Sequence, residues 1–365
     1  MDQFDVFIPT FGNRPAHLVG RESIIRDFSD SLRRAVGHPN RATLLIGQRG
    51  MGKTALLLEF ADKAEEAGFL AIRVTANEFM LDDIIGMIQE NGKRHLKSKL
   101  KVKGASAGAF GFSFGITFHE GDGKGLSFLN KMIVLCEELE KHNLGLVLLV
   151  DEVQARSTEL RVLTTTYQHL VGEGKNVALA MAGLPHAISA VLNDEVLTFF
   201  NRAHKVYLGP LNLSAISVYY SKVFTGLGLS ISPETLDRAV VATRGYPYLL
   251  QLVGYYILSF TAENKEISGE IVTNALISAR RDLIDSIFMP VLRPLSKKDL
   301  QFIKAMAVDV DESATSDIKA RMKTSDVTMH TYRKRLIDAG VIASERRGYV
   351  SFVVPYLGEY LRGEI

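Results

Sequence analysis

The chain has 365 residues, a formal net charge of +2 and a single cysteine, Cys136. This length allows two or three domains with sizeable cores. The small net charge excludes an overall electrostatic attraction of the chain to nucleic acid or membrane, so any surface that binds them must be a local patch of charge. One cysteine excludes an internal disulfide, and we expect a cytoplasmic protein because no signal peptide and no apolar run of about 20 residues is visible.

The first strong feature follows a helix predicted from about Glu22 to Val36. An apolar strand over 42–47 leads directly into a complete G-x-x-x-x-G-K-T loop, and an apolar helix comes next. Strand, glycine loop and helix in this order form a phosphate loop, in which backbone N–H groups and a helix N-terminus surround a phosphate. We therefore predict nucleoside triphosphate binding, with Lys53 on the β- and γ-phosphates and Thr54 on Mg²⁺. The rest of the cradle would be Gly47, Gln48, Arg49, Gly50, Met51 and Gly52.

Strand and helix patterns then alternate as far as about residue 205. The predicted strands are 42–47, 69–74, 145–150 and 177–182. Such alternation favours an α/β fold with a parallel sheet covered on both faces. A basic and glycine-rich insertion at about 93–125 interrupts it, with small and aromatic residues alternating over 104–116. That alternation favours a hairpin or flap, either simply solvated or in contact with a phosphate backbone or partner subunit.

The strand predicted at 145–150 ends in two carboxylates, Asp151 and Glu152. A surface acidic pair is the plain alternative, but the upstream phosphate loop favours a catalytic pair. We predict that Asp151 holds Mg²⁺ and that Glu152 is the general base for the attacking water. A further cation is expected to stabilise charge on the γ-phosphate, and the candidates are Arg202 and Arg244. For each, an ordinary surface arginine is the alternative.

The pattern changes twice more toward the C-terminus. Residues 211–292 read as wholly helical, with a start signal at Ser232-Pro233. From residue 293 a capping box at Ser296 and Asp299 opens a helix, and two more helices and a hairpin follow, which predicts a winged helix-turn-helix. The predicted domains are a nucleotide-binding core at 1–209, a helical lid at 210–292 and the winged helix at 293–365. The C-terminal elements are expected at 316–322, 326–339, 341–344 and 349–354.

These motifs resemble the AAA+ superfamily of P-loop ATPases, in particular the origin-recognition-like and STAND branch. The resemblance implies a three-layer P-loop sandwich followed by the lid and winged helix. It also implies that Val19, in Leu18-Val19-Gly20-Arg21-Glu22, lies near the adenine and that Arg202 is the arginine finger. Gly245-Tyr246-Pro247 resembles the G-x-P signature of STAND lids, so Pro247 and the adjacent Arg244 would contact nucleotide. One departure is the strand at 177–183, which lacks the polar first sensor, so either hydrolysis is slow or the attacking water is positioned differently.

The resulting functional hypothesis is an ATP-binding and ATP-hydrolysing switch, with Mg²⁺, that couples nucleotide state to double-stranded DNA binding and homo-oligomer assembly. The second helix of the motif would present Ser325, Thr328, Met329, Thr331 and Tyr332 to DNA. Contacts to phosphates would come from Arg333, Lys334, Arg335, Arg346 and Arg347. The alternative is a STAND-type signalling ATPase whose winged helix binds a protein partner. Neither hypothesis involves a membrane.

Overall fold

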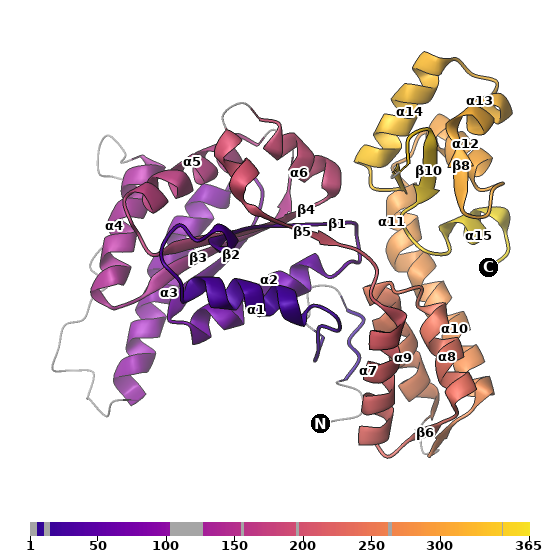
Figure 1. Ribbon diagram of the computed structural model, residues 1–365, viewed down its shortest axis with the longest axis horizontal. Helices are drawn as coiled ribbons and strands as arrows, with labels where there is room; N and C mark the ends of the chain where they lie inside the picture. The colour runs from indigo at the N-terminus through magenta and orange to yellow at the C-terminus, as the bar shows by residue number, and fades with distance from the viewer. Residues whose placement is uncertain are drawn as a thin grey trace. The chain divides into compact units, whose positions relative to one another are not determined.

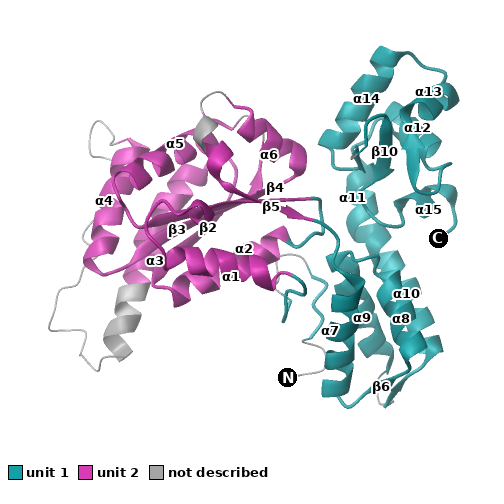
Figure 2. Cartoon of the chain, in the orientation of Figure 1, with its two compact units in different colours: residues 1–20, 48–52, 209–365 teal, residues 21–47, 53–208 magenta. Residues whose placement is uncertain are grey.

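The computed structural model describes residues 6–10, 15–102, 127–154, 157–194, 197–261, 265–344 and 346–365. The segment predicted as a hairpin or flap, 104–116, lies outside the described residues. The chain forms two compact units (Figure 2), of which the first comprises residues 1–20, 48–52 and 209–365 and the second residues 21–47 and 53–208. This division groups residues 1–20 with the C-terminal half of the chain, and the domains 1–209, 210–292 and 293–365 stay predictions.

The second unit is built on a parallel sheet of five strands in the order β2-β3-β4-β1-β5 (Figure 1). The strands are β1 (Ala42–Gly47), β2 (Phe69–Thr75), β3 (Gly145–Val153), β4 (Val177–Gly183) and β5 (His204–Leu208). Four of them were predicted from apolar runs, and β5 was not. It is an edge strand of five residues with Tyr207 71% exposed, so it lacks the apolar run of a strand buried on both faces.

Helices cover both faces of this sheet. They are α1 (Glu22–Leu32), α2 (Lys53–Glu66), α3 (Met80–Val102), α4 (Phe128–Lys141), α5 (Thr158–Gly172) and α6 (Pro185–Leu192). Alternate residues of β1 to β4 share one core with the apolar faces of α3 to α6. On the opposite face α1 and α2 lie together, where Phe28 stacks on Phe60 with ring centroids 3.9 Å apart. The result is a three-layer sandwich.

Helix α1 ends four residues before the predicted position, at Leu32, and Arg41 supplies the physical reason. This side chain is 3% exposed and donates hydrogen bonds to the carbonyls of Ser31, Leu32 and Arg34. Carbonyls at a helix C-terminus lack intrahelical donors, so the guanidinium supplies hydrogen bonds there and joins the end of α1 to the start of β1.

Helices dominate the lid part of the first unit. They are α7 (Leu213–Gly226), α8 (Pro233–Ala242), α9 (Pro247–Thr261), α10 (Gly269–Leu283) and α11 (Met289–Leu292), with a π-helical turn at Ile284–Phe288. The predicted start of α8 is confirmed, because the Ser232 hydroxyl accepts a hydrogen bond from the Thr235 N–H. The wholly helical prediction missed two short parallel strands, β6 (Ser230–Ile231) and β7 (Glu266–Ile267). Two residues are too few to produce a periodic pattern.

The C-terminal part of the first unit contains the three predicted helices and the predicted hairpin. The elements are α12 (Lys297–Met306), β8 (Glu312–Ala314), α13 (Thr315–Met322), α14 (Asp326–Asp338), β9 (Ile342–Ala343), β10 (Tyr349–Phe352) and α15 (Leu357–Arg362). The capping box of Ser296 and Asp299 is present. The unpredicted β8 is three residues long and pairs antiparallel with β10, giving the order β8-β10-β9. Within the described parts of the chain, no helix has the length and apolar character that crossing a membrane requires.

Candidate nucleotide-binding site

The glycine loop lies where the sequence places it, between the end of β1 and the start of α2. Gly50 and Gly52 have φ angles of 74° and 83°, in the left-handed region that side chains disfavour. Helix α2 begins at Lys53, so its first backbone N–H groups follow the loop directly. The loop therefore ends on a helix N-terminus with free donors and partial positive charge, which is the arrangement that binds phosphate.

Lys53 is folded back on the loop that precedes it. Its ammonium donates a hydrogen bond of 2.8 Å to the Gly47 carbonyl. The contact spans the whole loop from its first glycine to its lysine, so the side chain is held at the loop. An ammonium carries three donors and acts as a point charge toward phosphate.

The two predicted metal ligands meet in the structure. The Thr54 hydroxyl donates a hydrogen bond of 2.6 Å to one carboxylate oxygen of Asp151, although 97 residues separate them in the sequence. Thr54 lies in the first turn of α2 and Asp151 near the end of β3. Parallel strands bring their carboxyl ends to one edge of the sheet, so the start of α2, which follows β1, and the acidic end of β3 come together. A hydroxyl and a carboxylate are oxygen ligands of the type that Mg²⁺ prefers.

Glu152 has an unusual backbone. Its φ is 54°, a left-handed conformation for a residue other than glycine, and the pairing of β3 with β4 is irregular between Val150 and Val153. The Glu152 N–H donates to the second oxygen of Asp151 at 2.8 Å. Asp151 is buried and Glu152 is exposed. The irregularity places the two carboxylates in different environments, and such strain is concentrated at functional sites.

Arg202 ends a short 3₁₀-helix, Thr198–Arg202, just before β5. It is exposed, and no acidic side chain among the described residues lies within ion-pair distance of it. Strand β4 is buried throughout, and its residues are apolar, as its sequence requires. The polar sensor whose absence the sequence indicated therefore has no candidate within β4.

Val19 and Pro247, the residues predicted near the nucleotide from the first unit, lie in well-packed places. Val19 is 6% exposed, and Pro247 is the first residue of α9. A Cβ on Gly20 would lie 3.7 Å from a methyl group of Leu211, so the segment around Val19 packs on the chain leading into α7.

Arg244 has a different partner from the predicted one. Its guanidinium forms an ion pair with Glu359 of α15 and lies 3.9 Å from the centroid of the Tyr356 ring. In the described structure this side chain therefore binds the C-terminal part of the first unit. Nucleotide contact by Arg244 would require this ion pair to open.

Tyr246 is a loop contact that sequence reasoning missed. Its hydroxyl donates a hydrogen bond of 2.7 Å to the Arg49 carbonyl in the glycine loop, and its side chain is fully buried. Burial raises the pKa of this hydroxyl, so it remains a donor at neutral pH. The only signal in the sequence was its place inside Gly245-Tyr246-Pro247.

The C-terminal basic residues fall into two groups. Arg333 donates to the Ser344 hydroxyl, Arg335 binds the buried Asp299, and Arg346 pairs with Glu312 at 3.4 Å. Lys334 and Arg347 are exposed and have no ion-pair partner among the described residues.

The face that α14 presents to solvent also differs from the expectation. The prediction that Met329 faces DNA is wrong, because it is 6% exposed and lies on the same buried face as Leu336, one heptad further on. Ser325 caps α14 by accepting from the Thr328 N–H. The exposed stripe at i, i+3, i+4 and i+7 consists of Val327, His330, Thr331 and Lys334.

No group of three or more His, Cys, Asp or Glu side chains placed to hold a metal occurs among the described residues. The pair of Thr54 and Asp151 is compatible with Mg²⁺ nonetheless, because this ion keeps several waters and needs few protein ligands. Cys136 is buried, and burial raises the pKa of its thiol to about 12, so it is a packing residue without thiolate reactivity.

Two protein-family models match parts of this chain. Residues 17–179, which include both the glycine loop and the carboxylate pair, match the model of the AAA ATPase domain. Residues 285–361 match the model of a domain of unknown function, DUF8462. A search of curated protein sequences found no match.

Solved structures similar to this chain include a Walker-type ATPase and two ORC proteins. The Walker-type ATPase PABY2304 of Pyrococcus abyssi is 19% identical with a TM-score of 0.70, covering 99% of both chains. The Aeropyrum pernix ORC2 protein, solved in ADPNP-ADP complexes, is 15% identical with a TM-score of 0.63, covering 98% of this chain and 95% of that chain. The Aeropyrum pernix ORC1 protein in complex with DNA is 17% identical with a TM-score of 0.50, covering 100% and 96%. The TM-scores of these structures show the fold, which is a P-loop AAA+ sheet followed by a largely helical C-terminal region.

Proposed function

We propose that this chain binds and hydrolyses ATP and acts as an AAA+ switch that couples nucleotide state to DNA binding and oligomer assembly. The observation that carries the proposal is the 2.6 Å hydrogen bond between Thr54 and Asp151. It joins the end of the phosphate loop to the acidic end of β3, and a strained glutamate stands next to it. An acidic pair that served only as polar surface would not be expected to lie within hydrogen-bond distance of the Thr54 hydroxyl.

The residues fit Mg-ATP in named roles. Thr54 and Asp151 would hold Mg²⁺, which when bound neutralises charge on the phosphate oxygens. Lys53 would exchange its bond with the Gly47 carbonyl for phosphate oxygens. Gln48, Arg49 and Met51 would contribute loop backbone to the cradle. The Glu152 carboxylate would accept a proton from the attacking water.

Arg202 supports the assembly part of the proposal. It is an exposed cation just before the edge strand β5, and no ion pair with a described residue occupies it. We assign it to the triphosphate bound by a neighbouring copy, where it would stabilise charge in the transition state. This role makes hydrolysis dependent on the concentration of the protein.

DNA binding is proposed for the segment from α12 to β10, which we interpret as a winged helix-turn-helix. In such a motif the second helix enters the major groove, and here α14 offers the stripe of Val327, His330, Thr331 and Lys334. Lys334 and Arg347 are the residues we assign to phosphate contacts, because Arg333, Arg335 and Arg346 already have partners within the unit.

A second candidate function is a signalling ATPase whose C-terminal segment binds protein. Two observations favour it. Three valines of this segment are exposed, with Val308 at 63%, Val310 at 82% and Val327 at 79%. In addition, three of the five basic residues predicted to contact DNA are engaged internally. An apolar surface with few available cations suits a protein partner better than a phosphate backbone.

The decisive experiment is Mg-ATP turnover by the full chain at several protein concentrations, with and without duplex DNA, at two salt concentrations. Stimulation by DNA that weakens steeply with salt supports the DNA-coupled switch, because phosphate contacts release counterions. Turnover that is unchanged by DNA supports the second candidate function, the signalling ATPase. Absence of ATP turnover in all conditions would contradict the enzymatic proposal.

A further inference from the structure

The short turn between α8 and α9, Thr243-Arg244-Gly245-Tyr246, has an over-determined backbone. Arg244 and Gly245 both have left-handed φ angles, of 48° and 70°. The Gly245 carbonyl accepts the Leu211 N–H at 2.7 Å, and a Cβ on Gly245 would lie 2.5 Å from the Leu211 carbonyl oxygen. The buried Thr243 hydroxyl bonds the Val240 carbonyl at 2.7 Å. Because these bonds fix its dihedrals, the turn moves as one piece.

On one side this turn holds the phosphate loop. Tyr246 donates to the Arg49 carbonyl, and a Cβ placed on Gly50 would lie 2.1 Å from the Tyr246 hydroxyl oxygen. The ring therefore occupies the space that a side chain at Gly50 would need. In a trans peptide the carbonyl and the N–H point in opposite directions, so the bond to Tyr246 directs the Gly50 N–H away from the ring. Tyr246 thereby sets the orientation of one peptide of the phosphate cradle.

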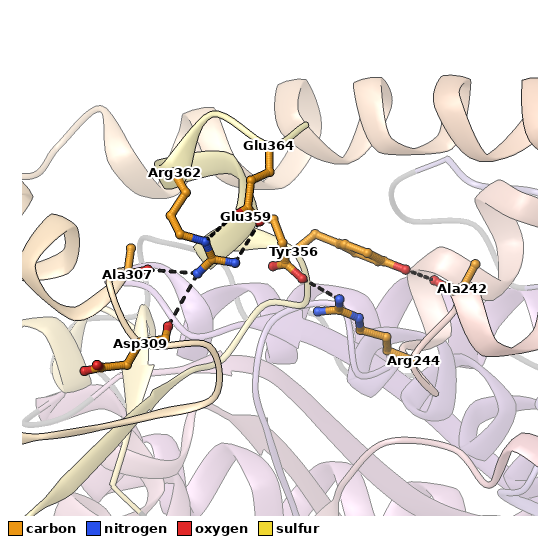
Figure 3. A network of polar contacts seen from close by, with 8 residues as sticks. All are labelled: Ala242, Arg244, Ala307, Asp309, Tyr356, Glu359, Arg362 and Glu364. Carbon is orange, nitrogen blue, oxygen red and sulfur yellow. Dashed lines mark hydrogen bonds and ion pairs between the residues drawn. The ribbon is translucent and has the colours of Figure 1, made fainter.

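On the other side the same turn holds the C-terminal helix α15 (Figure 3). Arg244 pairs with Glu359 and lies over the Tyr356 ring, and the Tyr356 hydroxyl donates to the Ala242 carbonyl at 2.8 Å. The Arg280 guanidinium also lies over that ring, 4.9 Å from its centroid. Tyr356 is 6% exposed and has a φ of 68°, so it too is held in a disfavoured conformation. The contact combines an ion pair with cation–π stacking.

We propose that this turn transmits the state of the phosphate loop to the C-terminal segment, with Tyr246 as the positioning residue at the loop and Arg244 as the positioning residue at α15. Only one residue separates them. A nucleotide that reorients the Arg49–Gly50 peptide breaks or strengthens the bond to Tyr246, and because the turn is rigid the displacement reaches the Arg244 guanidinium. The contact with Glu359 and Tyr356 then changes with nucleotide state. The inference rests on the proposed ATP binding and deepens it.

The test uses hydrogen–deuterium exchange of the full chain with and without saturating Mg-ADPNP, read over residues 353–362. Wild type is expected to show a nucleotide-dependent change in this segment. Tyr246→Phe keeps the ring and removes the bond to Arg49, and it should at least halve that change. Glu359→Gln keeps the shape and removes the ion pair, so the exchange rate of the segment should no longer depend on nucleotide. Nucleotide affinity should stay within about threefold of wild type, since a single neutral hydrogen bond is at stake.

Matched controls separate this role from general destabilisation. Tyr255→Phe alters a tyrosine of α9, the helix that follows Tyr246, and Glu364→Gln alters a carboxylate that pairs with Arg362. Both should keep the wild-type response. If Tyr246→Phe and Glu359→Gln also keep it while binding nucleotide normally, this inference is overturned and the proposed function stands. If wild type binds no Mg-ADPNP, the proposed function fails and the inference fails with it.

Discussion

The proposed function has two halves, ATP chemistry at the carboxyl edge of the sheet and DNA binding at the exposed surface of α14. The backbone places the functional residues in the first region, whereas the choice of side-chain partners decides which residues are available in the second. At the sheet edge, strand pairing brings Thr54 to Asp151 across 97 residues. On α14, three basic side chains grouped in the sequence separate in the structure. Lys334 is exposed, while Arg333 and Arg335 bind Ser344 and Asp299.

The difference shows what a motif can predict. A phosphate loop specifies backbone conformation through its glycines, and a parallel sheet can place that backbone in only a few ways. A cluster of arginines specifies only charge, and each long side chain can reach either solvent or a neighbouring carboxylate. The first region is therefore predictable from residue spacing. The second depends on which partners the fold brings within reach.

The largest expected effect breaks the chemistry at the sheet edge. Glu152→Gln should retain Mg-ATP binding and lower turnover by about 1,000-fold, because the amide cannot accept the proton of the attacking water. Single-turnover hydrolysis and equilibrium nucleotide binding measure the two effects. Glu173→Gln, an exposed carboxylate at the end of α5, is the control. Wild-type turnover in Glu152→Gln would rule out the assigned base.

The next effect concerns the loop itself. Lys53→Ala should weaken Mg-ATP binding by about 100-fold, since it removes a charge-assisted contact with phosphate worth about 3 kcal/mol. Isothermal titration calorimetry measures the change. Lys63→Ala removes a lysine of the same helix whose partner is Glu66, and its affinity should match wild type. Equal affinities for all three proteins would show that Lys53 does not contact the phosphates.

A smaller effect tests the surface of α14. Lys334→Ala should weaken duplex DNA binding severalfold and lower the slope of log affinity against log salt by about 1, because one phosphate contact is lost. Arg335→Ala should instead lower the free energy of unfolding by about 2 kcal/mol, because the buried Asp299 loses its cation. Salt-titrated DNA binding and chemical denaturation read the two outcomes. A slope changed by Arg335→Ala and unaffected by Lys334→Ala would reverse this assignment.

The smallest effect concerns the contact between Arg244 and Glu359. Burial alone would raise the pKa of Glu359, but hydrogen bonds from Arg244 and from its own backbone, with the charges of Arg244 and Arg362, lower it below 4.5. The pair therefore stabilises the fold above about pH 4.5, and this contribution is lost as the pH falls through the lowered pKa. Glu359→Gln should cost less than about 1 kcal/mol at pH 7 because the pair is partly exposed. Denaturation curves of the two proteins should converge in acid, and a constant difference would contradict the ionised pair.

Much of the fold could be predicted from the sequence because many elements carry a strong local pattern. Four buried strands were recognised as apolar runs, and the capping serines at 232 and 296 mark helix starts that the structure confirms. The strands that escaped prediction, β5, β6, β7 and β8, are short and lie where few residues alternate. Their strand conformation comes from pairing with a neighbour, and pairing leaves little trace in a sequence of two to five residues.

The sequence by itself determined the phosphate loop, the carboxylate pair after β3 and the order of the elements, because these depend on glycine conformations, apolar periodicity and short-range capping. Only the tertiary structure decided three contacts. These are the hydrogen bond of Tyr246 to the loop peptide, the contact of Arg244 with Glu359 and Tyr356, and the ion pair of Arg335 with Asp299. Each of these contacts joins residues that are far apart in the chain. Long side chains have several acceptors within reach, so the packed neighbours select the partner.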